Sequence, residues 1–77
     1  MKVFIYALDK TLYEGEAEAI SLPTVDGEIT VLNKHLPIIT SLKKGVIKIS
    51  NGKEKKNFEI KSGFAEINQK QTIILIK

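Results

Sequence analysis

Apolar and polar residues alternate along most of this chain, in runs that are too short for amphipathic helices. Isoleucine occurs twelve times, and valine, threonine and aromatic residues fill much of the remaining apolar pattern. These residue types favour strands. Turn-forming pairs such as Glu14-Gly15, Lys44-Gly45 and Ser62-Gly63 interrupt the runs at short intervals. Many short strands separated by frequent turns are typical of an all-β sandwich or a small barrel.

The clearest local signal is Asn51-Gly52, because both residue types tolerate the positive φ that a type I′ turn requires. We expect residues 45–50 to pair antiparallel with residues 53–61 through this turn. Side chains alternate between the two faces of a strand, so the apolar side chains of this hairpin should share one face. The core face would carry Ile47, Ile49, Phe58 and Ile60, and the solvent face Asn57, Glu59 and Lys61.

Two further hairpins are predicted from the same kind of pattern. Asp26-Gly27 is a second turn signal, so residues 17–22 are expected to return along residues 28–32. Near the end of the chain, residues 63–67 are expected to turn through residues 68–70 and to continue as a strand over residues 72–76.

The segment that follows the second hairpin contains the only histidine of the chain, His35, and one of its two prolines, Pro37. Leu36, Ile39 and Leu42 are three residues apart, which would place them on one face of a helix. Pro37 biases Leu36 toward extended backbone, and the two isoleucines after it are β-branched. We therefore expect at most one helical turn, then a strand, with Pro37 holding a structural corner.

Length and composition indicate a single domain over residues 1–77, with the charge unevenly placed along the chain. The net charge is +3, yet residues 1–38 hold three lysines and six acids, whereas residues 39–77 hold nine lysines and three acids. Arginine and cysteine are both absent. The absence of cysteine excludes a disulfide framework and a thiolate zinc site. The first apolar run is closed by Asp9 and is too short for a membrane span.

No residue pattern in the chain points to catalysis, a metal or a cofactor. His35 is the only side chain with an ordinary pKa near neutrality, and none of the serines lies in a G-x-S-x-G motif. One histidine without cysteine is a poor metal site, and no glycine-rich loop precedes a helix to hold phosphate. We therefore expect a non-catalytic protein with no cofactor and no metal.

Two binding functions remain as alternatives. A basic all-β domain of this size could be an OB-like module that binds single-stranded nucleic acid, with Phe4 and Tyr6 on one strand face to stack on bases. The absence of arginine argues against that function, because arginine is the usual reader of phosphate and base edges. A second alternative is an adaptor that accepts a partner strand at an exposed sheet edge.

The order and spacing of several short motifs resemble the N-terminal domain of the epsilon subunit of bacterial and chloroplast F-type ATP synthases, whose mitochondrial counterpart is called delta. The resemblance covers the whole chain, and the histidine-proline block together with the glycine positions is its most specific part. The matching positions are Leu12-Tyr13-Glu14-Gly15; Leu22-Pro23 with Gly27-Glu28; Val31-Leu32, His35, Pro37-Ile38-Ile39-Thr40, Leu42 and Gly45; and Gly63-Phe64 with Glu66.

The resemblance implies an all-β fold, a flattened sandwich of two antiparallel five-stranded sheets. It also implies a non-catalytic rotor subunit of the central stalk that links the gamma subunit to the membrane c-ring in proton- or sodium-driven ATP synthesis. Such a subunit is peripheral to the membrane, on the cytoplasmic face of a bacterial membrane or the stromal face of a thylakoid. No nucleic acid and no direct membrane insertion are expected.

The same resemblance implies which residues meet the partners. The turn with Gly27-Glu28 and the corner around His35 match the ring-facing region of the family, and Glu28 would meet a polar or basic loop of the ring. Full-length family members carry a C-terminal helical hairpin that inhibits ATP hydrolysis. The sequence ends at Lys77 without such a segment, so we expect no inhibition by that route. The expected interface residues are Asp26, Gly27, Glu28, Ile29, Lys34, His35 and Pro37.

Overall fold

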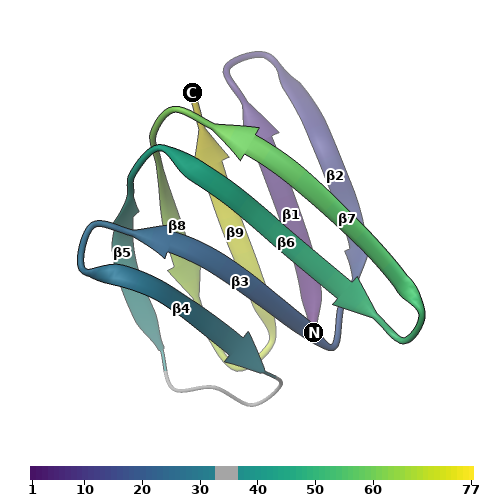
Figure 1. Cartoon of the computed structure of the whole chain (residues 1–77). Coiled ribbons are helices and arrows are strands. Elements are labelled where there is room, and N and C mark those ends of the chain that lie inside the picture. The colour runs from purple at the N-terminus through teal and green to yellow at the C-terminus, as the bar shows by residue number, and fades with distance from the viewer. Residues whose placement is uncertain (33–36) are drawn as a thin grey trace.

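The regular structure of the chain consists of strands. The computed structural model describes residues 1–32 and 37–77, and these residues form nine strands and no helix (Figure 1). The strands are β1 (Lys2–Ala7), β2 (Lys10–Glu16), β3 (Ala19–Thr24), β4 (Gly27–Leu32), β5 (Ile38–Leu42), β6 (Gly45–Asn51), β7 (Glu54–Ile60), β8 (Gly63–Ile67) and β9 (Gln71–Ile76).

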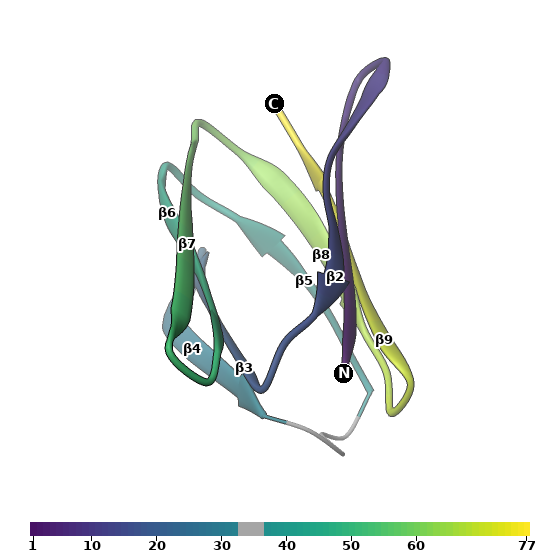
Figure 2. The ribbon, with the colours of Figure 1, turned by 90° about the vertical axis from the view of Figure 1, so that its right-hand side faces the viewer.

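The strands make two layers that face each other, as Figure 2 shows edge-on. One layer has the strand order β2-β1-β9-β8-β5, and the other has the order β4-β3-β6-β7. The layers are joined along one side, where the end of β5 reaches β3 through the pair Thr24–Leu42. Two further backbone bonds hold this seam, from Val25 N to Ser41 O at 3.1 Å and from Lys43 N to Pro23 O at 2.8 Å.

The predicted all-β sandwich is confirmed, with two differences in detail. The layers contain five and four strands in the described residues, whereas the resemblance implied five in each. The other difference is that β1 and β9 pair in parallel. These two strands come from opposite ends of the chain, so no turn connects them and nothing forces them to run in opposite directions.

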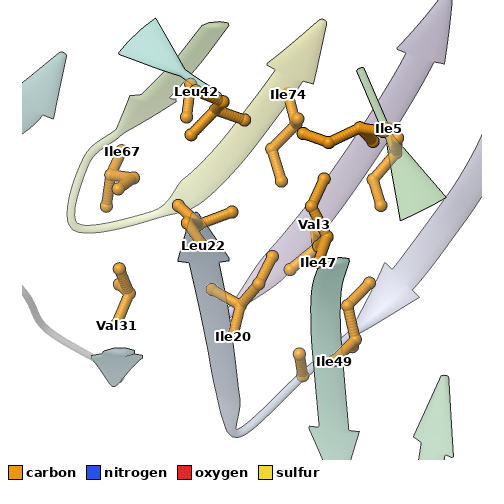
Figure 3. Packing of buried hydrophobic residues seen from close by; sticks show 13 residues of the cluster. Val3, Ile5, Ile20, Leu22, Val31, Leu42, Ile47, Ile49, Ile67 and Ile74 are labelled. Atoms are coloured by element: carbon orange, nitrogen blue, oxygen red, sulfur yellow. The ribbon is translucent and has the colours of Figure 1, made fainter. Parts of the chain in front are cut away.

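The core lies between the two layers and is almost entirely aliphatic (Figure 3). Every strand except β2 contributes buried residues to it, and where a strand contributes two they are two positions apart, because successive side chains point to opposite faces. Burial of this aliphatic surface supplies the main driving force for folding. The buried members are Val3, Ile5, Ala17, Ile20, Leu22, Val31, Leu42, Ile47, Ile49, Ile60, Ala65, Ile67 and Ile74.

An aromatic contact closes the sandwich on the side opposite the β3–β5 seam. Tyr13 on β2 and Phe58 on β7 meet edge to face, with ring centroids 5.9 Å apart. The Lys56 ammonium lies 5.5 Å from the centre of the Tyr13 ring, within the range of a cation–π contact. Both rings are half-buried against the core, so they cover the edge that the backbone leaves unpaired.

The predicted hairpin of β6 and β7 is confirmed, but its turn lies one residue later in the chain. Asn51 pairs with Glu54, so Gly52 and Lys53 form the turn, and Gly52 has a φ of 67°. Glycine thus occupies the first turn position, where the backbone adopts positive φ. The predicted faces are correct: Ile47, Ile49 and Ile60 are buried and Phe58 is half-buried, whereas Asn57, Glu59 and Lys61 are exposed.

The hairpin of β8 and β9 forms where the pattern predicts it. The Asn68 side chain orders its turn, because Oδ1 accepts hydrogen bonds from the backbone N–H groups of Lys70 at 2.8 Å and Gln71 at 2.9 Å. Such side-chain acceptors are a usual way to satisfy turn amides. The strand predicted after Pro37 is also present as β5, and it shows no helical turn from Ile38 onward.

Candidate interaction surfaces

In residues 1–32 and 37–77, no group of three or more acidic, histidine or cysteine side chains is placed to hold a metal ion. Every buried side-chain nitrogen or oxygen in that part of the chain has a hydrogen-bond partner. No helix there is long and apolar enough to cross a bilayer. Two surfaces of the described residues are candidate interaction sites.

The first surface, which we call the β3–β4 turn, comprises residues 25–28. Thr24 pairs with Gly27, so Val25 and Asp26 form the turn, one residue earlier than predicted. The buried Thr24 hydroxyl donates to the Gly27 carbonyl and accepts a bond from the Asp26 N–H at 3.2 Å. Gly27 has a φ of 125°, which an L residue adopts only with strain. These local bonds and the glycine hold Asp26 in a fixed position.

The residues predicted around this turn differ in exposure. Asp26 and Glu28 are both exposed, and Glu28 lies on β4 opposite Pro23 of β3. Ile29 is half-buried and packs against the core. The turn therefore offers two carboxylates to a partner, while Ile29 serves mainly the core.

The remaining predicted interface residues fall in or beside the segment that is not described. Lys34 and His35 lie outside the described residues, so their predicted role stays a prediction. Pro37 is exposed and immediately precedes β5. In the preceding strand, Val31 is buried, whereas Leu32 is 58% exposed, so the two side chains serve different surfaces.

The second surface is the outer face of the β1–β9–β8–β5 sheet, and we call it the apolar face. Sheet register places its side chains in two rows across the strands. Phe4 lies beside Ile73, and Glu66 separates Ile73 from Ile39. In the next row, Tyr6 lies beside Leu75 and Leu75 beside Phe64. The apolar face is thus defined by Phe4, Tyr6, Ile39, Phe64, Ile73 and Leu75.

These side chains are accessible to a partner. Ile39 is 65% exposed, Leu75 52% and Phe64 43%. Phe4 and Tyr6 are half-buried and stack with centroids 6.0 Å apart. The second row opens into a groove of about 510 Å³ toward the β1–β2 turn, where the fully exposed Leu8 projects beside it. Contiguous apolar surface of this kind on a small protein marks an interaction site.

The apolar face was not predicted from the sequence, although the sequence contains a signal for it. Residues 72–76 read TIILI, so β9 is apolar on both faces. A strand that faces a core on one side and water on the other should alternate apolar and polar residues. The outward pair Ile73 and Leu75 therefore indicates that a second surface covers this strand.

The residues around Phe4 and Tyr6 on the apolar face also test the alternative that the chain binds single-stranded nucleic acid. Phe4 and Tyr6 do share an outer face, as that alternative requires. Ile73 and Leu75 of β9 lie beside these rings, and Glu14 of β2 lies beside Phe4. The Lys2 ammonium is 5.5 Å from the Phe4 ring centre, and Lys77 borders the groove that Tyr6 lines. A nucleic-acid groove would combine stacking rings with several cations along the backbone path. Aliphatic side chains and an acid beside the rings argue against that function.

The two surfaces lie on different layers of the sandwich. The β3–β4 turn is at the left edge of the front layer in Figure 1, whereas the apolar face covers the outside of the back layer. Two partners could therefore contact the chain at the same time.

Known proteins similar to this chain are ATP synthase subunits. An epsilon chain from a Cyanothece strain is 34% identical over 76 residues, which cover 99% of this chain and 55% of the relative. The epsilon chain of Gloeothece citriformis is also 34% identical over the same shares. The chain thus spans about half the length of the curated relatives that it matches.

Solved structures show the same fold. A chain in the Euglena gracilis mitochondrial ATP synthase, solved as OSCP, F1 and c-ring, superposes with a TM-score of 0.89 at 25% identity over 96% of this chain and 48% of that one. A chain in the central stalk and c-ring of the Tetrahymena thermophila enzyme superposes with a TM-score of 0.80 at 16% identity, over 97% and 61%. Residues 1–77 match the family described as the beta-sandwich domain of the ATP synthase delta/epsilon chain. The chain therefore belongs to the delta/epsilon family of ATP synthase subunits.

Proposed function

We propose that residues 1–77 act as one non-catalytic domain of the ATP synthase rotor and link the gamma subunit to the c-ring. Family membership supports the assignment to the complex. The observation that carries the mechanical role is the apolar face, a broad exposed surface on a closely packed sandwich. A protein interior packed at crystal-like density transmits force with little deformation, which suits a part that must turn together with two others.

The apolar face is the surface that we assign to gamma. Interfaces that stay assembled have an apolar centre enriched in aromatic residues and a polar rim. Phe64 and Leu75 occupy the middle of this face, Glu66 lies between Ile73 and Ile39, and Glu14 of β2 borders Phe4. Lasting contact with gamma would remove these side chains from water and stabilise the assembled stalk by the hydrophobic effect.

The β3–β4 turn is the surface that we assign to the c-ring. Asp26 and Glu28 are exposed at the end of a hairpin whose backbone is held by Thr24 and Gly27. Two carboxylates on a rigid turn complement polar or basic loops and contribute mainly to orientation and association rate. Docked in this way, the chain is peripheral to the coupling membrane, on its cytoplasmic or stromal side, and does not insert into it.

A matched pair of variants tests the assignment to gamma. Leu75→Lys places a charge in the centre of the apolar face, and Leu32→Lys makes the same change at a leucine of similar exposure on the other layer. We expect Leu75→Lys to weaken binding to purified gamma by tenfold or more, that is by at least about 1.4 kcal/mol. Binding isotherms with the whole chain measure this effect.

The control variant Leu32→Lys shows whether a loss of gamma binding is specific to the apolar face. Leu32→Lys should bind gamma as the unchanged chain does, and both variants should retain the circular dichroism spectrum of the parent. Equal binding by the two variants would contradict the assignment of the apolar face. Loss of binding in Leu32→Lys alone would move the gamma contact to the opposite layer.

A further inference from the structure

A groove of about 330 Å³ lies on the outer face of the β3–β6–β7 sheet, on the layer opposite the apolar face. Its polar lining consists of side chains that can donate hydrogen bonds. No carboxylate lines it. Ala19, with its short side chain, forms part of the surface of the depression. The lining residues that matter for its chemistry are Ser21, Lys48, Ser50, Lys55 and Asn57.

Sheet register explains why these donors meet, although they are distant in sequence. Ser21 of β3 pairs with Lys48 of β6, and Lys48 pairs with Asn57 of β7. Ser50 pairs with Lys55 in the adjacent row. Paired residues share a face, so the two rows project to the same side. Lys48 and Lys55 are then diagonal neighbours across the strands, with Cα atoms about 7–8 Å apart.

Among the described residues, no ion pair or hydrogen bond involves the side chain of Lys48 or Lys55. Glu59 is the diagonal neighbour of Lys48 on the side away from Lys55, and it does not line the groove. Two like charges on neighbouring strands repel each other. An anion placed between them would remove this repulsion.

We propose that this groove binds a ligand that carries adjacent phosphate groups. Lysine holds phosphate as a point charge, and hydroxyl and amide groups supply the remaining hydrogen bonds to its oxygens. The two lysines would each neutralise one phosphate, while the Ser21 and Ser50 hydroxyls and the Asn57 amide donate to the oxygens between them. Lys48 and Lys55 are exposed, so a ligand reaches them from solvent.

The adjacent lysine pair between β5 and β6 lacks this combination. Lys43 and Lys44 are adjacent and exposed between β5 and β6, but neither lines the groove. They represent the ordinary case of solvated surface charge. The groove differs from this pair because its two cations share one depression with three neutral hydrogen-bond donors.

The proposed site is independent of the proposed rotor function. It lies on the layer that faces away from the apolar face, so the contact with gamma and the phosphate ligand do not compete for surface. Failure of one proposal therefore leaves the other unchanged.

Titration of the whole chain with inorganic pyrophosphate tests the proposal. Two-dimensional ¹⁵N NMR spectra at about 0.15 M salt report both affinity and location. We expect saturable shifts centred on residues 19–21, 48–50 and 55–57. Lys48→Gln together with Lys55→Gln should weaken binding about tenfold or more, because two charge-assisted contacts are lost. The matched control is Lys43→Gln with Lys44→Gln, which removes the same charge elsewhere and should leave the affinity unchanged.

A second arm distinguishes a soluble phosphate from a lipid headgroup. Flotation with vesicles that contain cardiolipin, whose headgroup carries two phosphates, compared with vesicles of phosphatidylcholine alone, measures lipid binding of the same variants. Binding to anionic vesicles that depends on Lys48 and Lys55, without a response to pyrophosphate, supports the site with a headgroup as its ligand. If pyrophosphate and vesicles both fail to saturate, or if the two double variants lose binding equally, the groove is solvated surface and the proposal is wrong.

Discussion

At the scale of single residues, glycines and one threonine determine where the backbone can turn and approach another strand. Gly27 and Gly52 adopt positive φ at the two turns of the front layer. Thr24 satisfies its own buried hydroxyl within the β3–β4 turn. Gly63 serves a different purpose, since a Cβ atom there would lie 2.5 Å from the Leu75 carbonyl oxygen and 3.3 Å from Ile76 Cα. Because glycine has a hydrogen atom in place of Cβ, β8 can approach β9 closely at this position.

Gly63→Ala should therefore destabilise the fold. The added methyl group meets backbone atoms of β9, which cannot rotate away, so the two strands must separate. Overpacking of this kind costs about 1–3 kcal/mol. Gly15→Ala is the matched control, because its Cβ would meet the end of the Tyr13 side chain, with 2.9 Å to the hydroxyl oxygen, and a side chain can move. Urea unfolding measures both changes; a loss in Gly15→Ala as large as that in Gly63→Ala would contradict this explanation.

Glu28→Lys tests the role of the β3–β4 turn. Glu28 is exposed and does not pack in the core, so the variant should fold normally as an isolated domain. Reversal of its charge should weaken assembly with the c-ring and lower the salt sensitivity of the binding that remains, because fewer attractive charge pairs are left to screen. Co-sedimentation with reconstituted rings measures assembly, with Glu59→Lys on the far strand β7 as the control. If the isolated Glu28→Lys domain unfolds, Glu28 is a structural residue.

At the scale of strands and hairpins, the apolar pattern predicted the faces of the strands correctly and their register incorrectly. In both front-layer hairpins the turn lies one residue away from its predicted place, which shifts the cross-strand pairs by two residues. A two-residue shift keeps every side chain on the same face. Ile47 is buried in both the predicted and the observed register of β6 and β7. The alternation of apolar and polar residues therefore could not distinguish these two registers. The deciding contributions are local, such as the bonds of Thr24 and the backbone of Gly52.

Other features could not be predicted from local pattern at all. The parallel pairing of β1 with β9 joins the two ends of the chain and has no turn signal. The apolar face arises only when four strands lie side by side, because Phe4, Phe64 and Leu75 are distant in sequence. The turn with Asp26 and Glu28 could be predicted because it depends on residues that are neighbours in the sequence. The turn is present, and both side chains are exposed.

The edge contact between β2 and β7 gives a prediction at this scale. Tyr13 and Phe58 close the open side of the sandwich with an edge-to-face contact. A double-mutant cycle with Tyr13→Ala and Phe58→Ala should give a coupling free energy of about 0.5–1.5 kcal/mol, beyond the loss of buried area in each single variant. Denaturant unfolding of the four proteins supplies the values. Additive effects of the two substitutions would show that the rings close the edge independently.

At the scale of the whole molecule, the two layers present surfaces of different chemistry. The back layer carries the apolar face, and the front layer carries both the donor-lined groove over β3, β6 and β7 and the carboxylates of the β3–β4 turn. The core between them is continuous, so the layers cannot move independently without opening it. A contact made on one layer is thereby held at a fixed distance and angle from a contact made on the other.

The measurement that tests the rotor assignment most directly is the accessibility of the apolar face in the assembled enzyme. The chain contains no cysteine, so Leu75→Cys and Leu32→Cys each introduce a single reactive thiol on opposite layers. Both thiols should react with a maleimide at similar rates in the isolated chain. In a complex with gamma and the c-ring, Leu75→Cys should become strongly protected while Leu32→Cys stays reactive. Unchanged reactivity of Leu75→Cys in the complex would contradict the account.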